Sequence, residues 1–206
     1  YRCRMKKVLT LLFFITAVLI TACAPEYDPV NGCEIRPETQ CSKFDLRGAY
    51  LHGANLSGAK LYHAGLEYVD FRRANLSGAD LNNADMTGAI VSNADLTDAD
   101  LTGADLTRAH LEGADLIRAN LTAADLTETN LSAANLYQAN LARANLYRAN
   151  LTQANLAEAD LSSARVWGAN LSRIILLGCV AHPHSVVQFV QVVDAMQVYH
   201  QRFLLV

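Results

Sequence analysis

Large apolar residues recur at every fifth position through the long central part of this chain. From Leu46 to Leu176 there are 27 such positions, and 23 of them are Leu. The residue two places before each one is usually small, and 23 of these 27 residues are Ala. Asp or Asn usually stands between the two, so the unit reads Ala-(Asp/Asn)-Leu-x-x. A repeat this regular predicts one repetitive architecture and not a mixed globular core.

A period of five fits neither regular secondary structure. Five residues advance about 500° on an α-helix, so the apolar row would wind round the axis and form no single face. On a flat strand the side chains alternate with a period of two, so consecutive Leu residues would point to opposite faces. The pattern is satisfied when the chain bends once per pentad. Ala and Leu then point inward from a short extended piece, and the next two residues turn the corner.

Units such as Ala-Asp-Leu at residues 94–96 and Ala-Asn-Leu at residues 144–146 resemble those of pentapeptide-repeat proteins. The resemblance implies four pentads per coil and an all-β fold, a right-handed quadrilateral β-helix. It covers residues 44–177, which would form about seven coils stacked at ~4.8 Å. No Pro lies between Pro37 and Pro183, so the expected ladders lose no backbone donor to proline.

The first 22 residues are predicted to be a secretory signal. Because position 1 is Tyr, either the sequence is a fragment or translation starts at Met5. Two Lys residues follow Met5, and residues 8–20 are an uncharged apolar run of 13. This run is too short for a bilayer span of about 20 residues, but it is typical of a signal peptide.

Residues 20–23, Ile-Thr-Ala-Cys, resemble the lipobox of bacterial lipoproteins. The resemblance implies that the Cys23 thiol is acylated and anchors the mature protein in a membrane. An uncleaved anchor and ordinary cleavage after Ala24 are the alternatives. Because Ala and not Asp follows Cys23, the resemblance favours the outer membrane.

The charge balance argues against a general nucleic-acid binder. The whole chain carries 17 Lys and Arg, 20 Asp and Glu, and a net charge of −3. Four of the basic residues precede Cys23, so removal of that segment leaves 13 basic against 20 acidic residues, a net charge of −7. Such a protein disfavours contact with anionic surfaces, so nucleic acid is not an expected partner.

Residues 23–43 are predicted to be a lipidated linker and N-terminal cap. Cys33 and Cys41 lie eight residues apart in this segment, and an exported location permits a disulfide between them. Two unpaired thiols are the alternative. Cys179 is left over and is expected to pack as a small apolar residue at the end of the coil.

Residues 20 apart should lie one above the other if four pentads make a coil. Asp85, Asp105 and Asp125 then form one column, in which like charges repel. Tyr147 and Trp167 stack in another column, and these five residues form a candidate binding patch. For the aromatic pair, packing that stabilises the wall is the favoured interpretation. Three further columns predict ladders of side chains: Asn130, Asn150, Asn170; Arg108, Glu128, Arg148; and Asp98, Arg118, Gln138, Glu158.

Acidic residues gather in one section of the repeats. Between Asp80 and Asp115 there are eight Asp and Glu residues, against the single base Arg108. A solvated face is the favoured interpretation, and cation binding is one alternative. Mimicry of nucleic-acid charge is another, implied by similarity to the family's gyrase-binding, fluoroquinolone-protecting members. Those members act in the cytoplasm, whereas this chain carries an export signal.

No residue pattern predicts a reaction centre. Cys179, His182 and His184 could supply three metal ligands, but their spacing matches no zinc motif. Acid–base catalysis needs differently tuned carboxylates in a cleft, and a filled tube offers none. We therefore expect no catalytic residue, no metal and no cofactor.

The repeat ends at Leu177, and residues 178–206 are predicted to cover the open end of the tube. Ser185 and Gln188 have the spacing of a capping box, followed by a wide apolar face and a narrow polar stripe. A helix there would protect an edge that otherwise templates aggregation. A homodimer contact, as in some family members, and a final strand are the alternatives.

Three functions follow from these features. The leading hypothesis is a non-enzymatic, lipid-anchored scaffold at the bacterial cell envelope that binds an unidentified protein partner. The second is an acidic mimic that inhibits a DNA-binding enzyme such as gyrase. The third is an envelope metal-binding protein or enzyme.

Overall fold

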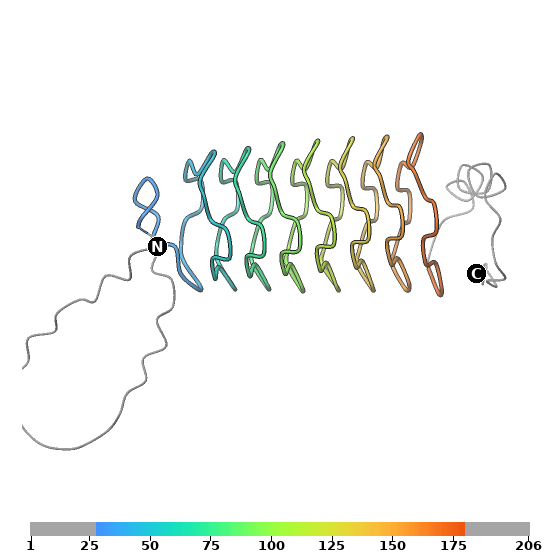
Figure 1. Cartoon of the computed structure of the whole chain (residues 1–206), viewed down its shortest axis with the longest axis horizontal. Coiled ribbons are helices and arrows are strands. Elements are labelled where there is room, and N and C mark those ends of the chain that lie inside the picture. The colour runs from blue at the N-terminus through green and yellow to red at the C-terminus, as the bar shows by residue number, and fades with distance from the viewer. Residues whose placement is uncertain (1–27, 180–206) are drawn as a thin grey trace, which may run out of the picture.

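The computed structural model describes residues 28–179, which form one stack of similar coils (Figure 1). Apart from one antiparallel bridge in the N-terminal cap, the β-structure consists of single-residue parallel bridges, each joining residues 20 apart, from Gln40 with Lys60 to Asn155 with Ile175. Within this range the chain has no α-helix and no strand longer than one bridge residue. One coil is therefore four pentads long, and the architecture is the predicted right-handed, four-sided β-helix.

The interior of the tube is filled by the Leu and Ala rows. Inward Leu residues such as Leu101 and Leu121 have no exposed surface, and the Ala residues two places before them are almost fully buried. Burying one Leu side chain is worth about 2 kcal/mol, so this row supplies most of the stabilisation. Thr129 stands at one Ala position, and its hydroxyl donates to the carbonyl of Leu106 at 2.7 Å, which satisfies a polar group in the core.

Four of the five backbone N–H groups in a pentad donate to backbone carbonyls. Three of them reach the coils above and below, and one closes the corner turn through the carbonyl three residues earlier. In the pentad 99–103 these donors and acceptors are Ala99 to Leu96 at 3.0 Å, Asp100 to Ala79 at 2.9 Å, Leu101 to Asn120 at 2.7 Å and Gly103 to Thr122 at 2.9 Å.

The fifth N–H explains why Asp or Asn follows Ala. In the same pentad the N–H of Thr102 donates to the side-chain Oδ1 of Asp100 at 3.0 Å. All twenty pentads with Asp or Asn at this position make the same bond, at 2.8 to 3.3 Å. The carboxylate or amide is thus part of the backbone hydrogen bonding of the coil.

Each corner is turned by a residue with positive φ. The last residue of every pentad, from Lys43 at 64° to Gly178 at 73°, lies in the left-handed region. This is the geometry that a type II turn requires at its third residue. Many of these residues are not Gly, although a left-handed conformation costs a residue with a Cβ about 1 kcal/mol. The ladders on either side of the corner hold these residues in that conformation.

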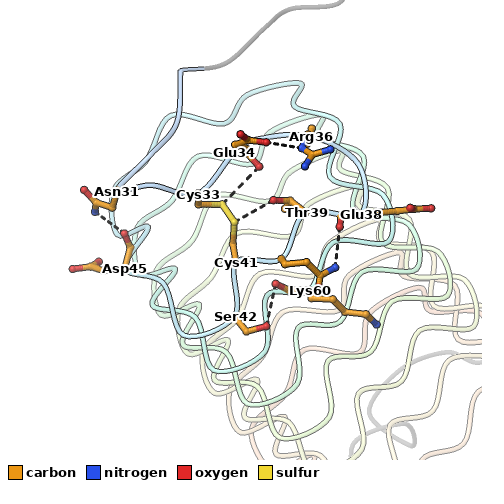
Figure 2. Close-up of a disulfide and its surroundings, with 11 residues drawn as sticks. Asn31, Cys33, Glu34, Arg36, Glu38, Thr39, Cys41, Ser42, Asp45 and Lys60 are labelled. Atoms are coloured by element: carbon orange, nitrogen blue, oxygen red, sulfur yellow. Dashed lines mark hydrogen bonds and ion pairs between the residues drawn. A yellow bond between two sulfur atoms is a disulfide. The ribbon is translucent and has the colours of Figure 1, made fainter.

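The N-terminal cap is a hairpin tied to the first coil (Figure 2). Val30 and Cys33 pair as an antiparallel bridge, and Cys33 is joined to Cys41 by a disulfide with a Cα–Cα distance of 5.5 Å. The side-chain amide of Asn31 donates to the carbonyl of Asp45 at 2.6 Å, which fastens the hairpin to the coil. The disulfide is therefore part of the cover over the open edge of the first coil.

The sequence predicts that the repeat starts at residue 44, but the parallel ladder begins one pentad earlier. Gln40 pairs with Lys60, and Thr39 and Cys41 are buried at the positions that Ala and Leu hold elsewhere. The sequence does not show the repeat there, because both signature residues are replaced. Half of the disulfide is consequently an inward residue of the coil.

At the other end, the last described residues remain in register. The Cys179 thiol is partly buried and donates to the carbonyl of Leu156, and burial raises the pKa of that thiol to about 11. The predicted helical cap and dimer contact in residues 178–206, together with His182 and His184, lie almost wholly outside the described residues.

Candidate binding surface

The structure brings the predicted Asp column together and gives it a structural role. Asp85, Asp105 and Asp125 are partly buried on one face, and adjacent members pair through parallel bridges. Their Oδ1 atoms accept the N–H groups of Thr87, Thr107 and Thr127, at 3.0, 2.9 and 2.9 Å. Asn145 continues the column, and its amide donates to Asp125 at 3.2 Å. One oxygen of each carboxylate is therefore occupied within the coil.

The acidic belt from Asp80 to Asp115 surrounds the tube. Its members fall in five different columns, so they do not form one flat patch: Asp80 and Asp100; Asp85 and Asp105; Asp95 and Asp115; Asp98; Glu112. Within residues 28–179, no group of three or more His, Cys, Asp or Glu side chains is arranged to hold a metal ion.

The two predicted corner ladders contain the expected contacts. Glu128 lies between Arg108 at 3.0 Å and Arg148 at 3.7 Å. At the opposite corner of the coil, the guanidinium of Arg118 donates twice to Asp98, at 2.7 and 2.6 Å. Hydrogen bonding to Arg118 lowers the pKa of Asp98 below its usual value. Exposed pairs of this kind contribute little to stability, so they support the wall without defining a site.

A polar cluster that the sequence did not predict lies beside the face that carries His110 and Asn130. Glu112 accepts hydrogen bonds from Ser92 at 2.8 Å and from the amide of Asn130 at 2.5 Å. His110 also contacts the Glu112 carboxylate, at 3.2 Å from its Nδ1. Ser92 bonds the carboxylate and has no contact with the imidazole, so the cluster is not arranged to activate a serine nucleophile. The sequence contained a signal for this contact, because Ser92 and Glu112 are 20 residues apart and are therefore neighbours in one column.

Tyr147 and Trp167 stack as predicted. Their ring centroids are 5.5 Å apart and their planes differ by 10°. The guanidinium carbon of Arg148 lies 4.9 Å from the Tyr147 ring centroid, which adds a cation–π contact. Trp167 is 65% exposed, so the pair packs the wall and also offers an aromatic surface. Its use in binding stays a prediction.

A second group of exposed aromatic side chains lies near the N-terminal end and was not singled out from the sequence. Tyr50, Tyr62 and Tyr68 are 55%, 38% and 69% exposed. Tyr50 stacks on His52 at 6.0 Å, and Tyr62 meets His63 edge-on at 6.0 Å. The signal was present, because Tyr50 replaces the usual Asp or Asn and Tyr68 occupies a corner that favours Gly.

Comparisons with known proteins agree on one family. A family model described as pentapeptide repeats matches in eight copies, over residues 38–67, 64–103, 104–141 and 139–178. A search of the curated proteins found no match. In residues 28–179, no helix has the length and apolar character needed to span a bilayer.

Solved structures with the same repeat also match. HetL is a pentapeptide repeat protein involved in heterocyst differentiation regulation from the cyanobacterium Nostoc sp. strain PCC 7120. It is 30% identical, with a TM-score of 0.29, over 70% of this chain and 86% of HetL. A pentapeptide repeat protein from the Arabidopsis thaliana thylakoid lumen is 30% identical, with a TM-score of 0.31, over 55% of this chain and 75% of that one. QnrB1, a plasmid-mediated fluoroquinolone resistance protein, is 16% identical over 81% of this chain and 90% of its own, with a TM-score of 0.38, and shares the fold alone.

Proposed function

Because the chain belongs to the pentapeptide repeat family, we propose that it is a non-enzymatic scaffold held at the bacterial cell envelope by a lipid on Cys23. The walls of its β-helix bind a protein partner, and the lipid places it at the outer membrane. The observation that carries this proposal is the order of residues 5–23: a positive start, an uncharged apolar run, and Ile-Thr-Ala before Cys23.

The cap supports an exported location. The disulfide between Cys33 and Cys41 covers the first coil, and such bonds persist in oxidising compartments and are rare in the cytosol. Cys33 is ten residues from Cys23, so a protein acylated at Cys23 would carry its lipid beside this cap. The two cysteine features favour the same side of the membrane.

The acidic columns favour a scaffold over an inhibitor that mimics DNA. Asp85, Asp105 and Asp125 each accept a backbone N–H with one carboxylate oxygen. The remaining acidic residues point in different directions around the tube. The proteins that bind DNA meet one continuous row of phosphates, which a ring of charge does not reproduce. The walls instead present short polar side chains at a regular spacing, on which aromatic groups such as Trp167 provide local anchors for a partner.

Fractionation of cells tests the anchor. Wild-type protein should sediment with the envelope and stay there in high salt, because two or more buried acyl chains give stable attachment that salt does not screen. Cys23→Ser should move the protein to a soluble pool or accumulate a larger precursor. Cys179→Ser is the matched control, since it removes a cysteine elsewhere in the chain, and it should behave as wild type. A soluble, cytoplasmic wild-type protein would refute the proposal and revive the gyrase-type mimic.

Capture from envelope extracts tests the scaffold. The protein is cross-linked in cells, extracted with detergent and then purified. Wild-type protein should retain specific partners, and the double variant Tyr147→Ser/Trp167→Ser should lose them. Matching substitutions at Thr87 and Thr107, which lie in the same column, should leave capture unchanged. Equal capture by both variants would exclude the aromatic pair as the binding anchor.

A further inference from the structure

Three outward Arg side chains gather on one side of the last two coils. Arg143 and Arg148 turn the corners at the two ends of that side, and Arg165 stands in its middle one coil further along. All three are exposed. Arg143 and Arg165 make no ion pair within residues 28–179, and Arg148 lies 3.7 Å from Glu128. This side therefore carries positive charge that the described part of the chain does not neutralise.

The stacked aromatic pair borders these charges. Outward side chains two residues apart in one pentad reach each other, as the ion pairs in the first coils show at 2.7 Å. Arg165 and Trp167 have this spacing, so they are neighbours on the wall. The guanidinium carbon of Arg148 lies 4.9 Å from the Tyr147 ring centroid. Exposed Arg and aromatic side chains are thus joined in one surface, and these residue types are enriched at the centres of protein interfaces.

Arg165 occupies a position at which the coil favours Asp or Asn. One coil earlier, Asn145 accepts the N–H of Tyr147 at 3.3 Å and donates its amide to Asp125 at 3.2 Å. A guanidinium has only donors, so Arg165 cannot accept the N–H of Trp167 in the same way. Natural proteins break such local rules chiefly at functional sites. The loss of the acceptor at residue 165 therefore indicates that a positive charge is useful there.

We propose that this Arg–aromatic patch binds an acidic segment of a protein partner. The patch consists of Arg143, Tyr147, Arg148, Arg165 and Trp167. The inference rests on the proposed function for the existence of that partner. Guanidinium groups bind carboxylates through charge-assisted and often bidentate hydrogen bonds, and the aromatic rings pack against apolar parts of the same segment. Residues 126–179 contain four Arg against three acidic residues, a net charge of +1, so this end does not repel an anion.

Acidic side chains nearby limit the patch to a short anionic ligand. Asp125 lies one coil before Asn145 on the same side, and Glu128 lies one coil before Arg148 at the same corner. Residues 80–125 contain nine acidic residues against two Arg. A nucleic-acid duplex or an anionic bilayer extends over many coils and would meet these acidic residues, whereas a segment of a few residues would not. The surroundings of the patch therefore favour an acidic peptide over an extended polyanion.

The single Trp of the chain lies in the patch and reports binding there. An oligoglutamate peptide is titrated into the purified mature protein while the emission of Trp167 is followed, and titration calorimetry repeats the measurement. Binding should saturate, and it should weaken as salt is added, because salt screens exposed ion pairs.

Arg165→Asn is the decisive variant. It should weaken binding about fivefold, and it should melt at or above the temperature of wild type, because Asn restores the acceptor for the N–H of Trp167. Arg173→Gln is the matched control, since it removes an exposed Arg from another corner of the same coil, and it should bind as wild type does.

Each other outcome would overturn the inference. If neither measurement detects binding of oligoglutamate, or if Arg165→Asn binds it as tightly as wild type, the patch is not an acidic-peptide site. If duplex DNA binds as tightly as the peptide, with the same dependence on Arg165, the patch is a general polyanion site.

Cross-linked capture in cells separates this inference from the proposed function. Partners that are lost with Tyr147→Ser/Trp167→Ser but retained by Arg165→Asn would leave the scaffold standing and overturn the acidic contact. A wild-type protein that captures no partner would refute the scaffold, and with it the protein ligand, even if the peptide titration succeeds.

Discussion

The Oδ1 atom of Asp100 accepts two hydrogen bonds from Thr102, one from its backbone N–H at 3.0 Å and one from its hydroxyl at 2.6 Å. An acceptor at this point serves the N–H that no neighbouring carbonyl reaches. Asp and Asn provide it equally well, which accounts for the alternation of these two residues along the repeat.

Replacing Asp100 therefore tests the role of this position. Asp100→Asn keeps the acceptor and also removes a charge from the column that contains Asp80, so its free energy of unfolding should equal or exceed that of wild type. Asp100→Leu leaves the Thr102 N–H without its partner and should cost about 1–2 kcal/mol. Urea unfolding followed by circular dichroism measures both. Equal stability of the two variants would show that the bond contributes nothing.

Interior and corner positions should tolerate charge very differently. Leu121→Asp places an unpaired carboxylate in the filled tube and should cost several kcal/mol. Ala123→Asp adds the same side chain two residues later, at an exposed corner whose φ of 57° Asp accepts well. That change should cost under about 0.5 kcal/mol. Similar drops in melting temperature for both variants would contradict the register.

Positive φ at the corners predicts that Gly stabilises where Ala destabilises. Ala123 has a φ of 57°, so Ala123→Gly should raise the free energy of unfolding by about 1 kcal/mol. Gly103→Ala at the same corner one coil earlier should lower it, because the new Cβ would also approach Oδ1 of Asn83 to 2.6 Å. Ala124→Gly, at a buried position, should destabilise and serves as the control. Thermal melts compare the three variants.

Stability should fall in acid through the paired carboxylates. Hydrogen bonding to Arg118 lowers the pKa of Asp98, and hydrogen bonding to Arg47 lowers the pKa of Asp45 to about 2. A carboxylate whose folded pKa is lowered contributes stability above its usual pKa and loses that contribution as the pH falls. The melting temperature should therefore fall as the pH drops from 5 towards the usual Asp value of 3.8 and on towards 2.

The matched variant for this experiment is Arg118→Met. It should melt below wild type at neutral pH, and the gap should close in acid because Asp98 is then protonated in both proteins. Arg143→Met changes a similar corner residue and should follow the wild-type profile. A gap for Arg118→Met that is constant from pH 7 to pH 2 would show that the contribution of Arg118 is independent of the carboxylate.

Sequence periodicity predicted the interior of this protein almost completely. A period of five with Ala and Leu two apart requires a corner in each pentad, and the buried rows through Leu121 follow from that alone. The 20-residue columns predicted the contacts of Glu128 with its two Arg neighbours and the stack of Tyr147 on Trp167. These succeeded because neighbours across coils are fixed by spacing once the closure number is known.

Features that break the repeat could not be predicted in the same way. Thr39 and Cys41 continue the ladder without its signature, so their place depends on the packing of the cap over the first coil. The sequence did not predict that the outward Asp and Asn side chains also accept a backbone N–H. A residue at an outward position is interpreted as surface only, although its side-chain oxygen is part of the backbone hydrogen bonding. The Glu112 cluster depends on rotamers, which spacing alone does not determine.

The disulfide of the cap gives the last prediction. Cys33 and Cys41 close a loop of eight residues, and such a short loop stabilises a fold by about 2–3 kcal/mol at most. Cys41 is also an inward residue of the coil, so Cys41→Ser buries a polar group in addition to breaking the bond. Cys33→Ser leaves the Cys41 thiol in place and should be the milder change. Protein recovered from the envelope and digested without reduction should yield the two cysteine peptides linked, by mass spectrometry. Both thiols free to alkylation in native envelope protein would show that the bond does not form there, and would remove the support that it gives to an exported location.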